Sequence, residues 1–135
     1  MTDIRNIESV QRRFTKKLCG LRDFSYQQRL TYLSAESLER RRLNQDLTTM
    51  FKIINGFIEV PVCDFFEFSN EQRTRGNSRK LIKPIYNLNI RKHSFACRNI
   101  NCWNTLPEYI VCANNLTCFK KYLSAYDLTK FLSLL

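Results

Sequence analysis

Glycine and proline are scarce in this sequence, with three of each among 135 residues. Because both residues mark turns, their scarcity disfavours a loop-rich fold or a sandwich of many short strands. Hydrophobic residues make up 44% and aromatic residues 13% of the chain, which excludes the composition of a disordered tail. Length and composition together predict one mainly α domain, residues 1–135, with a core of its own.

Long apolar runs are also missing. No stretch reaches the ~18 consecutive apolar residues of a membrane-spanning helix, and the start, MTDIRNIESVQRR, lacks the apolar segment of a signal peptide. The sequence therefore predicts an intracellular protein of the cytoplasm or nucleus, with no membrane among its partners. In such a compartment the six cysteines are expected to stay reduced.

None of the cysteines forms a Cys-x-x-Cys pair. A zinc site can be drawn from His93, Cys97, Cys102 and either Cys112 or Cys118, but this spacing is not that of a common zinc ribbon or finger. We favour the alternative that these cysteines are small buried hydrophobic residues. The sequence predicts no metal, no cofactor and no small-molecule substrate.

Basic residues are abundant: 22 Lys and Arg stand against 12 Asp and Glu, which gives a net charge of +10. An excess of this size suggests a polyanionic partner, and nucleic acid is the commonest. The alternative is an ordinary basic surface that only aids solubility.

The longest predicted helix lies within residues 34–58. Its apolar residues recur at steps of three and four, the spacing of one helical stripe. We expect Ser34 to cap its start and Gly56 to end it in a left-handed conformation. The stripe comprises Leu43, Leu47, Met50, Phe51, Ile54, Phe57 and Ile58.

Two shorter helices are predicted before it. The first covers about residues 4–19, and the second begins after Ser25, its expected cap. Residues 1–58 are thus expected to form a three-helix part. The apolar stripe of the first helix is Ile7, Val10, Phe14, Leu18 and Leu21, and that of the second is Tyr26, Leu30 and Leu33.

Residues 59–93 have a different texture. Pro61 suits the first turn of a short helix over residues 62–66, and the polar stretch 69–80 is a loop. We predict a small β ribbon that pairs residues 78–84 with residues 88–93, against the alternative of an extended loop packed on the helices.

The remaining residues, 94–135, are expected to form C-terminal helices. One covers residues 94–104, a short one starts near Pro107, and the last is capped by Asn114 or Asn115. Trp103 shares helical spacing with Phe95 and Ile100, which favours a core position over a role in stacking on bases.

Ordered motifs along the chain resemble the end of the reverse transcriptase polyprotein of non-LTR retrotransposons, of the jockey-like and chicken-repeat-like kind. The likeness covers about residues 7–128. It rests on ESVQRRFTKKL, SYQQRLTYLSAESLERRRLNQDLTTMFKIINGF, DFFEF, TRGNSRKL, RKHSFACRNINCWNTLPEYIV and LTCFKKYL, in this order.

In that family this block lies downstream of the polymerase palm and includes thumb-like helices and a C-terminal extension, so the resemblance implies a thumb-like part in residues 1–58. Reverse transcriptases of this kind hold two metal ions with paired aspartates. Here no two acidic residues are adjacent, and there is one histidine. The resemblance therefore implies no catalytic residue in this chain, although the parent is a polymerase with an endonuclease. The Met1 start inside the family pattern suggests a truncated copy or a partial gene model.

Similar thumb helices grip the template–primer duplex through its phosphates, and such contacts carry affinity with little sequence information. The first candidate site is the helical cluster, which joins the basic face of the first helix to the triple arginine. Its members are Arg12, Arg13, Lys16, Lys17, Arg40, Arg41 and Arg42. The alternative is a solvated basic face.

Two further basic groups are candidates for phosphate contact. The loop cluster is Arg73, Arg75, Arg79 and Lys80, where Gly76 allows a close backbone approach and Thr74 and Ser78 add hydroxyl donors. The 91–92 pair is Arg91 and Lys92, beside His93, Arg98 and Trp103. An ordinary charged loop is the alternative for the first of these two.

The sequence as a whole predicts a nucleic-acid-binding segment that clamps RNA or an RNA–DNA hybrid while the palm of the parent polyprotein, its second expected partner, performs the chemistry. One alternative is a protein–protein module in which residues 95–126 dock on the polymerase or another protein. The other is a decayed transposon copy without function.

Overall fold

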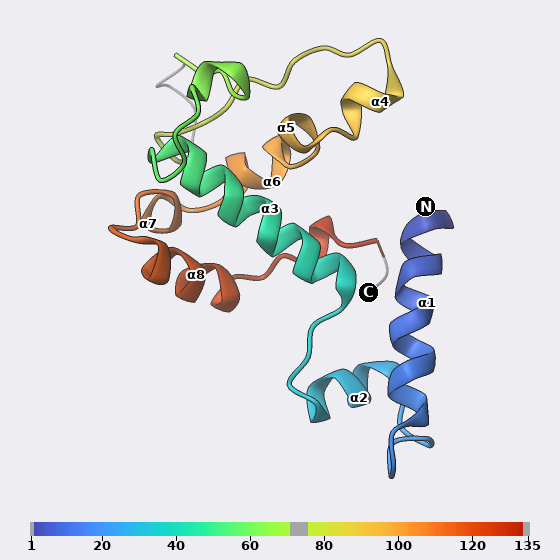
Figure 1. Cartoon of the computed structure of the whole chain (residues 1–135). Helices are drawn as coiled ribbons and strands as arrows, with labels where there is room; N and C mark the ends of the chain where they lie inside the picture. Colours follow the sequence, from blue (N-terminus) through green and yellow to red (C-terminus); the bar gives the residue numbers. More distant parts are fainter. Residues whose placement is uncertain (1, 71–75, 134–135) are drawn as a thin grey trace. The chain divides into compact units, whose positions relative to one another are not determined.

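The structure is a computed structural model that describes residues 2–70 and 76–133, and its regular elements there are helices, which confirms the mainly α prediction (Figure 1). By its contacts the chain divides into a first unit, residues 1–43 with 127–135, and a second unit, residues 44–126. The expectation of a single folding domain stays a prediction, because a division by contacts does not measure cooperativity.

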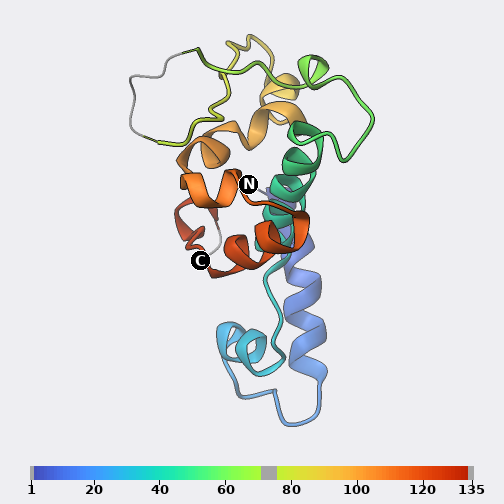
Figure 2. The same ribbon diagram turned by 90° about the vertical axis from the view of Figure 1, so that its left-hand side faces the viewer.

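The first unit contains α1 (Thr2–Lys17), α2 (Tyr26–Tyr32), the start of α3 (Leu38–Ile54) and the 3₁₀ helix η2 (Thr129–Phe131). The chain reverses between α1 and α2, as Figure 2 shows. The predicted cap of α2 is confirmed: the Ser25 hydroxyl accepts from the amide of Gln28 at 3.3 Å, and the Gln28 side chain accepts from the amide of Ser25 at 2.8 Å. This reciprocal pair is a capping box.

Helix α1 buries a polar face. Ile7, Val10 and Phe14 of its predicted apolar stripe are 58%, 66% and 64% exposed, whereas Glu8 and Thr15 are 1% and 4% exposed. The hydroxyl of Thr15 accepts a hydrogen bond from Nε of Arg29 at 3.1 Å. The helix was predicted correctly, but the face that it buries carries hydrogen-bonded polar side chains instead of the predicted apolar stripe.

Helix α3 begins at Leu38, so the predicted cap at Ser34 is wrong. Ser34 has a φ of 50° and belongs to the turn that follows α2. The free amides of the first turn of α3 are satisfied in another way: Ser37 Oγ accepts from the amide of Arg40 at 3.2 Å, and Glu8 Oε2 accepts from the amide of Leu38 at 3.0 Å. Two acceptors at this later position fix the start of the helix.

The end of α3 is as predicted. Gly56 has a φ of 71°, and the amide of Phe57 donates to the carbonyl of Lys52 at 2.8 Å, which is the pattern of a Schellman motif. Leu47, Met50 and Phe51 of the predicted stripe are fully buried in the second unit, whereas Phe57 is 56% exposed. The stripe therefore ends before the glycine.

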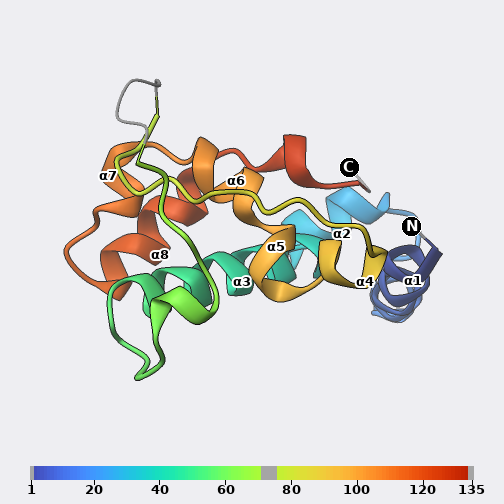
Figure 3. The same cartoon turned by 90° about the horizontal axis from the view of Figure 1, so that it is seen from above.

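The second unit is organised around α3 and α8 (Leu116–Ala125), which lie side by side (Figures 1 and 3). The rings of Phe51 and Phe119 stack with centroids 4.2 Å apart, and Trp103 lies 6.3 Å from Phe119. Trp103 is fully buried, which confirms its predicted core position. Around this pair run η1 (Val62–Asp64), α4 (Asn89–Lys92), α5 (Phe95–Arg98), α6 (Ile100–Thr105) and α7 (Glu108–Val111).

The expected helix over residues 94–104 is in fact two helices, α5 and α6, which meet at Asn99. The side chain of Asn99 is buried and donates to Asp46 Oδ2 at 2.8 Å. The later caps agree with the sequence, because Pro107 precedes α7 and the Asn115 side chain accepts from the amide of Cys118 at 2.8 Å.

The predicted β ribbon is wrong. Residues 78–84 and 88–93 do not pair, and residues 89–92 form α4. Among the described residues the only β pairing is a single antiparallel bridge between Phe68 and Leu81. The backbone of Leu81 is held by a side chain instead: its amide donates to Oδ1 of Asn104, and its carbonyl accepts from Nδ2, both at 2.8 Å. The side-chain amide of Asn104 thus makes the two hydrogen bonds that a neighbouring strand would make to Leu81.

Over the part of the chain that the structure describes, none of the helices combines the length and apolarity that a membrane crossing requires.

Candidate nucleic-acid interface

The basic residues of α1 face solvent. Arg12, Arg13, Lys16 and Lys17 are all exposed along its second half. The guanidinium carbon of Arg12 lies over the ring of Tyr26, 4.6 Å from its centroid, in the geometry of a cation–π contact. The other three cations extend from the same half of the helix, where they can meet an anion.

The triple arginine at the start of α3 is divided in its contacts. Nε of Arg40 lies 3.2 Å from Oε1 of Glu36, and its side chain is 24% exposed. Arg41 and Arg42 are exposed. Two of the three guanidiniums therefore remain accessible, and a partly exposed i,i+4 pair such as that of Arg40 contributes little to stability.

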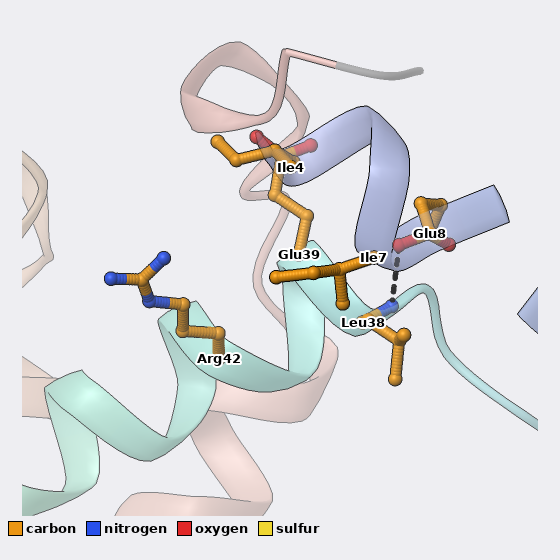
Figure 4. A pocket seen from close by; sticks show the side chains of 6 residues that line it. All are labelled: Ile4, Ile7, Glu8, Leu38, Glu39 and Arg42. Atoms are coloured by element: carbon orange, nitrogen blue, oxygen red, sulfur yellow. Dashed lines mark hydrogen bonds between the residues drawn. The ribbon is translucent and has the colours of Figure 1, made fainter. Parts of the chain in front are cut away.

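Glu8 connects α1 to α2 and to the start of α3. Its two carboxylate oxygens accept from the hydroxyl of Tyr26 and from the amide of Leu38, the second of these at 3.0 Å (Figure 4). Burial and the contact with Glu8 raise the pKa of the Tyr26 hydroxyl. Nε2 of Gln11 also donates to the carbonyl of Glu36 at 3.0 Å. The cations of α1 and those at the start of α3 thus belong to one hydrogen-bonded body.

A small cavity lies beside Glu8 in the same unit. It measures about 60 Å³ and is lined by Ile4, Ile7, Glu8, Leu38, Glu39 and Arg42 (Figure 4). A water molecule occupies ~30 Å³ in the liquid, so this volume is too small for a nucleotide. We assign the cavity no ligand.

In the loop cluster, Arg73 and Arg75 lie outside the described residues, as does Thr74. The described part binds an anion of its own chain. The amide and the hydroxyl of Ser78 each donate to a carboxylate oxygen of Glu108 at 2.6 Å, and these bonds lower the pKa of Glu108. Ser78, which the sequence predicted to donate to a phosphate, thus donates to a carboxylate of the chain itself, and phosphate contact by the loop cluster stays a prediction.

The two described cations of this loop are also engaged. Nη1 of Arg79 donates to Oδ1 of Asn55. Lys80 is half-buried, and a Cβ built on Gly76 would come within 2.5 Å of its Cε atom, so the glycine leaves room for the lysine stem. Since Gly76 has a φ of 136°, a side chain there would also strain the backbone. This segment acts as a structural connection in the second unit.

Asn77 is a key residue of that connection, and sequence reasoning missed it. It is 4% exposed, and its Nδ2 donates to the carbonyls of Trp103 at 3.1 Å and of Leu106 at 2.9 Å. Its Oδ1 accepts from the amide of Arg79 at 3.0 Å, which is an Asx turn. Nε1 of Trp103 then donates to the carbonyl of Arg79 at 2.9 Å. The Gly-Asn-Ser sequence is a recognisable signal for the turn, but nothing marks its partners.

The 91–92 pair is exposed in the last turn of α4, and His93 follows it on the surface. Arg98 has a different role. Its Nε and Nη2 donate to the two oxygens of Asp46 at 2.8 and 2.7 Å, and Asn99 donates to the same carboxylate. The structure thus removes Arg98 and the buried Trp103 from this candidate site.

The residues considered for zinc are separated by their burial. Cys97 and Cys102 are buried, whereas His93 and Cys112 are exposed. Across residues 2–70 and 76–133, no group of three His, Cys, Asp or Glu side chains is placed to hold a metal ion. The interpretation of these cysteines as small buried hydrophobic residues is confirmed for Cys97 and Cys102, whereas it is wrong for the exposed Cys112, and Cys118 is half-buried.

No family model matches this chain, and neither the curated proteins nor the solved structures contain a match. The resemblance to retrotransposon polyproteins therefore rests on the ordered motifs of the sequence.

Proposed function

We propose that this chain is a nucleic-acid-binding C-terminal segment of a non-LTR retrotransposon reverse transcriptase. It grips RNA or an RNA–DNA hybrid through backbone phosphates, while a palm outside this sequence performs the polymerisation. One observation supports the proposal above all: five cations of the helical cluster, Arg13, Lys16, Lys17, Arg41 and Arg42, are exposed within one compact unit.

Exposed cations of this kind suit phosphates better than bases. A polynucleotide releases condensed counterions when lysine and arginine neutralise its phosphates, and this release dominates affinity that is independent of sequence. Phe14 is the one aromatic residue exposed on α1, and the other exposed residues of its stripe, Ile7 and Val10, are aliphatic and cannot stack on bases. The first unit is therefore expected to bind many sequences with similar affinity and a strong dependence on salt.

The primary test is a salt titration of binding to a short RNA–DNA hybrid, followed by fluorescence anisotropy, with circular dichroism as a check of folding. A linear fall of log affinity with log salt gives the number of phosphates, at about 0.9 in slope for each. No binding at low salt by a folded chain would overturn the proposal. No binding by an unfolded chain would show that the segment needs its polymerase to fold.

Charge reversal then locates the contact. Reversing Arg40, Arg41 and Arg42 together is expected to weaken RNA binding without unfolding the chain, but it also breaks the ion pair with Glu36. The double variant Arg41→Glu, Arg42→Glu avoids this, and we expect it to lower the salt slope by about 1.8. Lys120→Glu, Lys121→Glu is the matched control, because both lysines are exposed on α8 in the second unit. Equal affinities of the two double variants at matched salt would remove the triple arginine from the interface.

A second candidate function is a protein–protein module. In residues 95–126 the rings of Tyr109 and Tyr122 pack edge to face at 5.6 Å and are 56% and 38% exposed, whereas Trp103 and Phe119 are used in the core. Exposed tyrosines are common in protein interfaces. A folded chain that ignores nucleic acid would make this function the leading one, with these two tyrosines as the first residues to change.

A further inference from the structure

The turn between α1 and α2 contains a hollow that the sequence did not predict. Its volume is about 510 Å³, and it is lined by Lys16, Lys17, Leu18, Cys19, Gly20 and Arg22. This turn hollow, as we name it, is an open concave surface, several times larger than the cavity beside Glu8. It lies wholly within the first unit.

The local backbone explains why the hollow exists. Helix α1 ends at Lys17, and Gly20 then takes a φ of 76°, which a residue with a side chain rarely adopts. The amide of Leu21 donates to the carbonyl of Leu18 at 3.2 Å, and the side chain of Leu21 is buried. This turn brings Arg22 back to the concave side, beside the two lysines that end the helix.

The lining carries charge of one sign. Lys16, Lys17 and Arg22 are exposed, no acidic residue lines the hollow, and Asp23 is not among its lining residues although it follows directly in the sequence. Among the residues that the structure describes, none forms a hydrogen bond or an ion pair with the side chains of these three cations. A concave surface with cations alone focuses the field and attracts an anion.

One part of this arrangement has a local explanation. Lysines in the last turn of a helix are stabilised by the negative end of its dipole. That effect accounts for Lys16 and Lys17 but not for Arg22, because Arg22 lies five residues beyond the end of α1. The helix dipole thus leaves Arg22 unexplained. Arg22 is therefore the residue that favours a binding site over a mere helix end with favourable charges.

We infer that the turn hollow is a phosphate-binding site that receives the backbone of the bound polynucleotide. This inference rests on the proposed function and makes it more specific: it names the part of α1 on which the strand lies, and it adds Arg22 to the predicted contacts. Lys16, Lys17 and Arg22 neutralise the phosphates, and the absence of a side chain at Gly20 lets the strand approach the backbone.

Cys19 provides a reporter in the hollow, since it is an exposed residue of the lining. Cys63, exposed on η1 in the second unit, is the internal control. The experiment alkylates the full chain with iodoacetamide, which is neutral, with and without a saturating RNA–DNA hybrid, and follows each cysteine by peptide mass spectrometry. We expect the hybrid to slow alkylation of Cys19 in proportion to the fraction bound and to leave the rate at Cys63 unchanged.

Inorganic phosphate at matched ionic strength is a second arm of the same experiment. Protection of Cys19 by the hybrid alone supports a site for a polynucleotide. Equal protection by inorganic phosphate would show a site for a free ion and would overturn the inference.

A pair of variants tests the role of Arg22 independently. Arg22→Ala is expected to lower the salt slope by about 0.9 and to weaken the protection of Cys19. Arg5→Ala, which removes an exposed cation of α1 outside the hollow, is the matched control. If the hybrid binds but Cys19 reacts at its free rate, or if Arg22→Ala binds like Arg5→Ala, the inference is wrong and the proposed function stands. Only the absence of all hybrid binding by the folded chain would overturn both the inference and the proposed function.

Discussion

The two units carry the same net charge but differ in how many of their cations are bound within the chain. In each, 11 Lys and Arg stand against 6 Asp and Glu. In the second unit Arg98 is bound to Asp46 and Arg79 to Asn55, while other cations of its described part are exposed, namely Lys83, Arg91, Lys92, Lys120 and Lys121. In the first unit most cations of α1 and two at the start of α3 face solvent. Net charge therefore does not locate an interface; what matters is which cations already have partners in the chain.

The buried residues of the two units differ as well. Half of those in the first unit are polar, whereas apolar and aromatic side chains dominate the second. Buried in the first unit are Leu21, Leu30, Leu43 and Leu128 with Glu8, Thr15, Arg29 and Ser37. Since a buried polar group stabilises only when its hydrogen bonds are made, the first unit depends on particular bonds and the second on apolar area.

The largest effect is expected in the apolar core of the second unit. Trp103→Ala removes a fully buried ring that packs on Phe119 and donates to the carbonyl of Arg79. We expect a loss of about 3–5 kcal/mol in the free energy of unfolding, the usual result of emptying such a site. Tyr109→Ala, at a ring that is 56% exposed, is the control. Urea denaturation measures both, and equal losses would mean that Trp103 is not a core residue.

Next in size is the polar cluster of the same unit. Asp46→Ala leaves Arg98 and Asn99 without their common acceptor, which we expect to lower the free energy of unfolding by about 2–3 kcal/mol, because the pair is only partly exposed. Glu36→Ala breaks the more exposed pair with Arg40 and is expected to lose about 0.5 kcal/mol. If both variants unfold at the same urea concentration, the ion pair of Asp46 contributes no more to stability than that of Glu36, and the prediction is wrong.

The third prediction concerns the inverted face of α1. Glu8→Ala removes the acceptor of Tyr26 and of the first amide of α3, so we expect a loss of about 2 kcal/mol. Val10→Ala, on the exposed apolar stripe, is expected to change the free energy of unfolding by less than about 0.5 kcal/mol. A larger loss at Val10 than at Glu8 would show that α1 buries its apolar stripe in solution.

Local signals in the sequence gave the helices but not their environment. Ser25, Gly56 and Asn115 define element ends because caps and left-handed turns are set by nearby residues. The start of α3 and the face of α1 were mispredicted for one shared reason. Glu8 bonds to groups 18 and 30 residues away, and no spacing rule reports such contacts.

The candidate site was predictable to a similar degree. The exposed arginines and lysines of α1 follow from helical periodicity. The role of the Gly76–Lys80 stretch could not be predicted from local spacing. Ser78 donates to Glu108, which lies 30 residues away, and the backbone amide of Leu81 donates to Asn104. Where the β ribbon was predicted, the side-chain amide of Asn104 bonds to the backbone of Leu81, and residues 89–92 form α4.

The smallest effect is a dependence on pH in the loop of the second unit. Hydrogen bonds from Ser78 lower the pKa of Glu108 below its ordinary value of 4.5. A lowered pKa means that folding favours the carboxylate, so the stabilisation is complete above the pKa of the unfolded chain and is lost as the pH falls through the pKa of the folded one.

The free energy of unfolding of the native chain should therefore exceed that of Glu108→Gln at pH 7 and converge with it in acid. Glu59→Gln, at another exposed carboxylate, is the control, and thermal melts across this range measure all three proteins. A constant difference between the native chain and Glu108→Gln at every pH would mean that Ser78 does not distinguish the carboxylate from the acid, and the contrast between the anion held in this loop and the accessible cations of the first unit would lose its electrostatic basis.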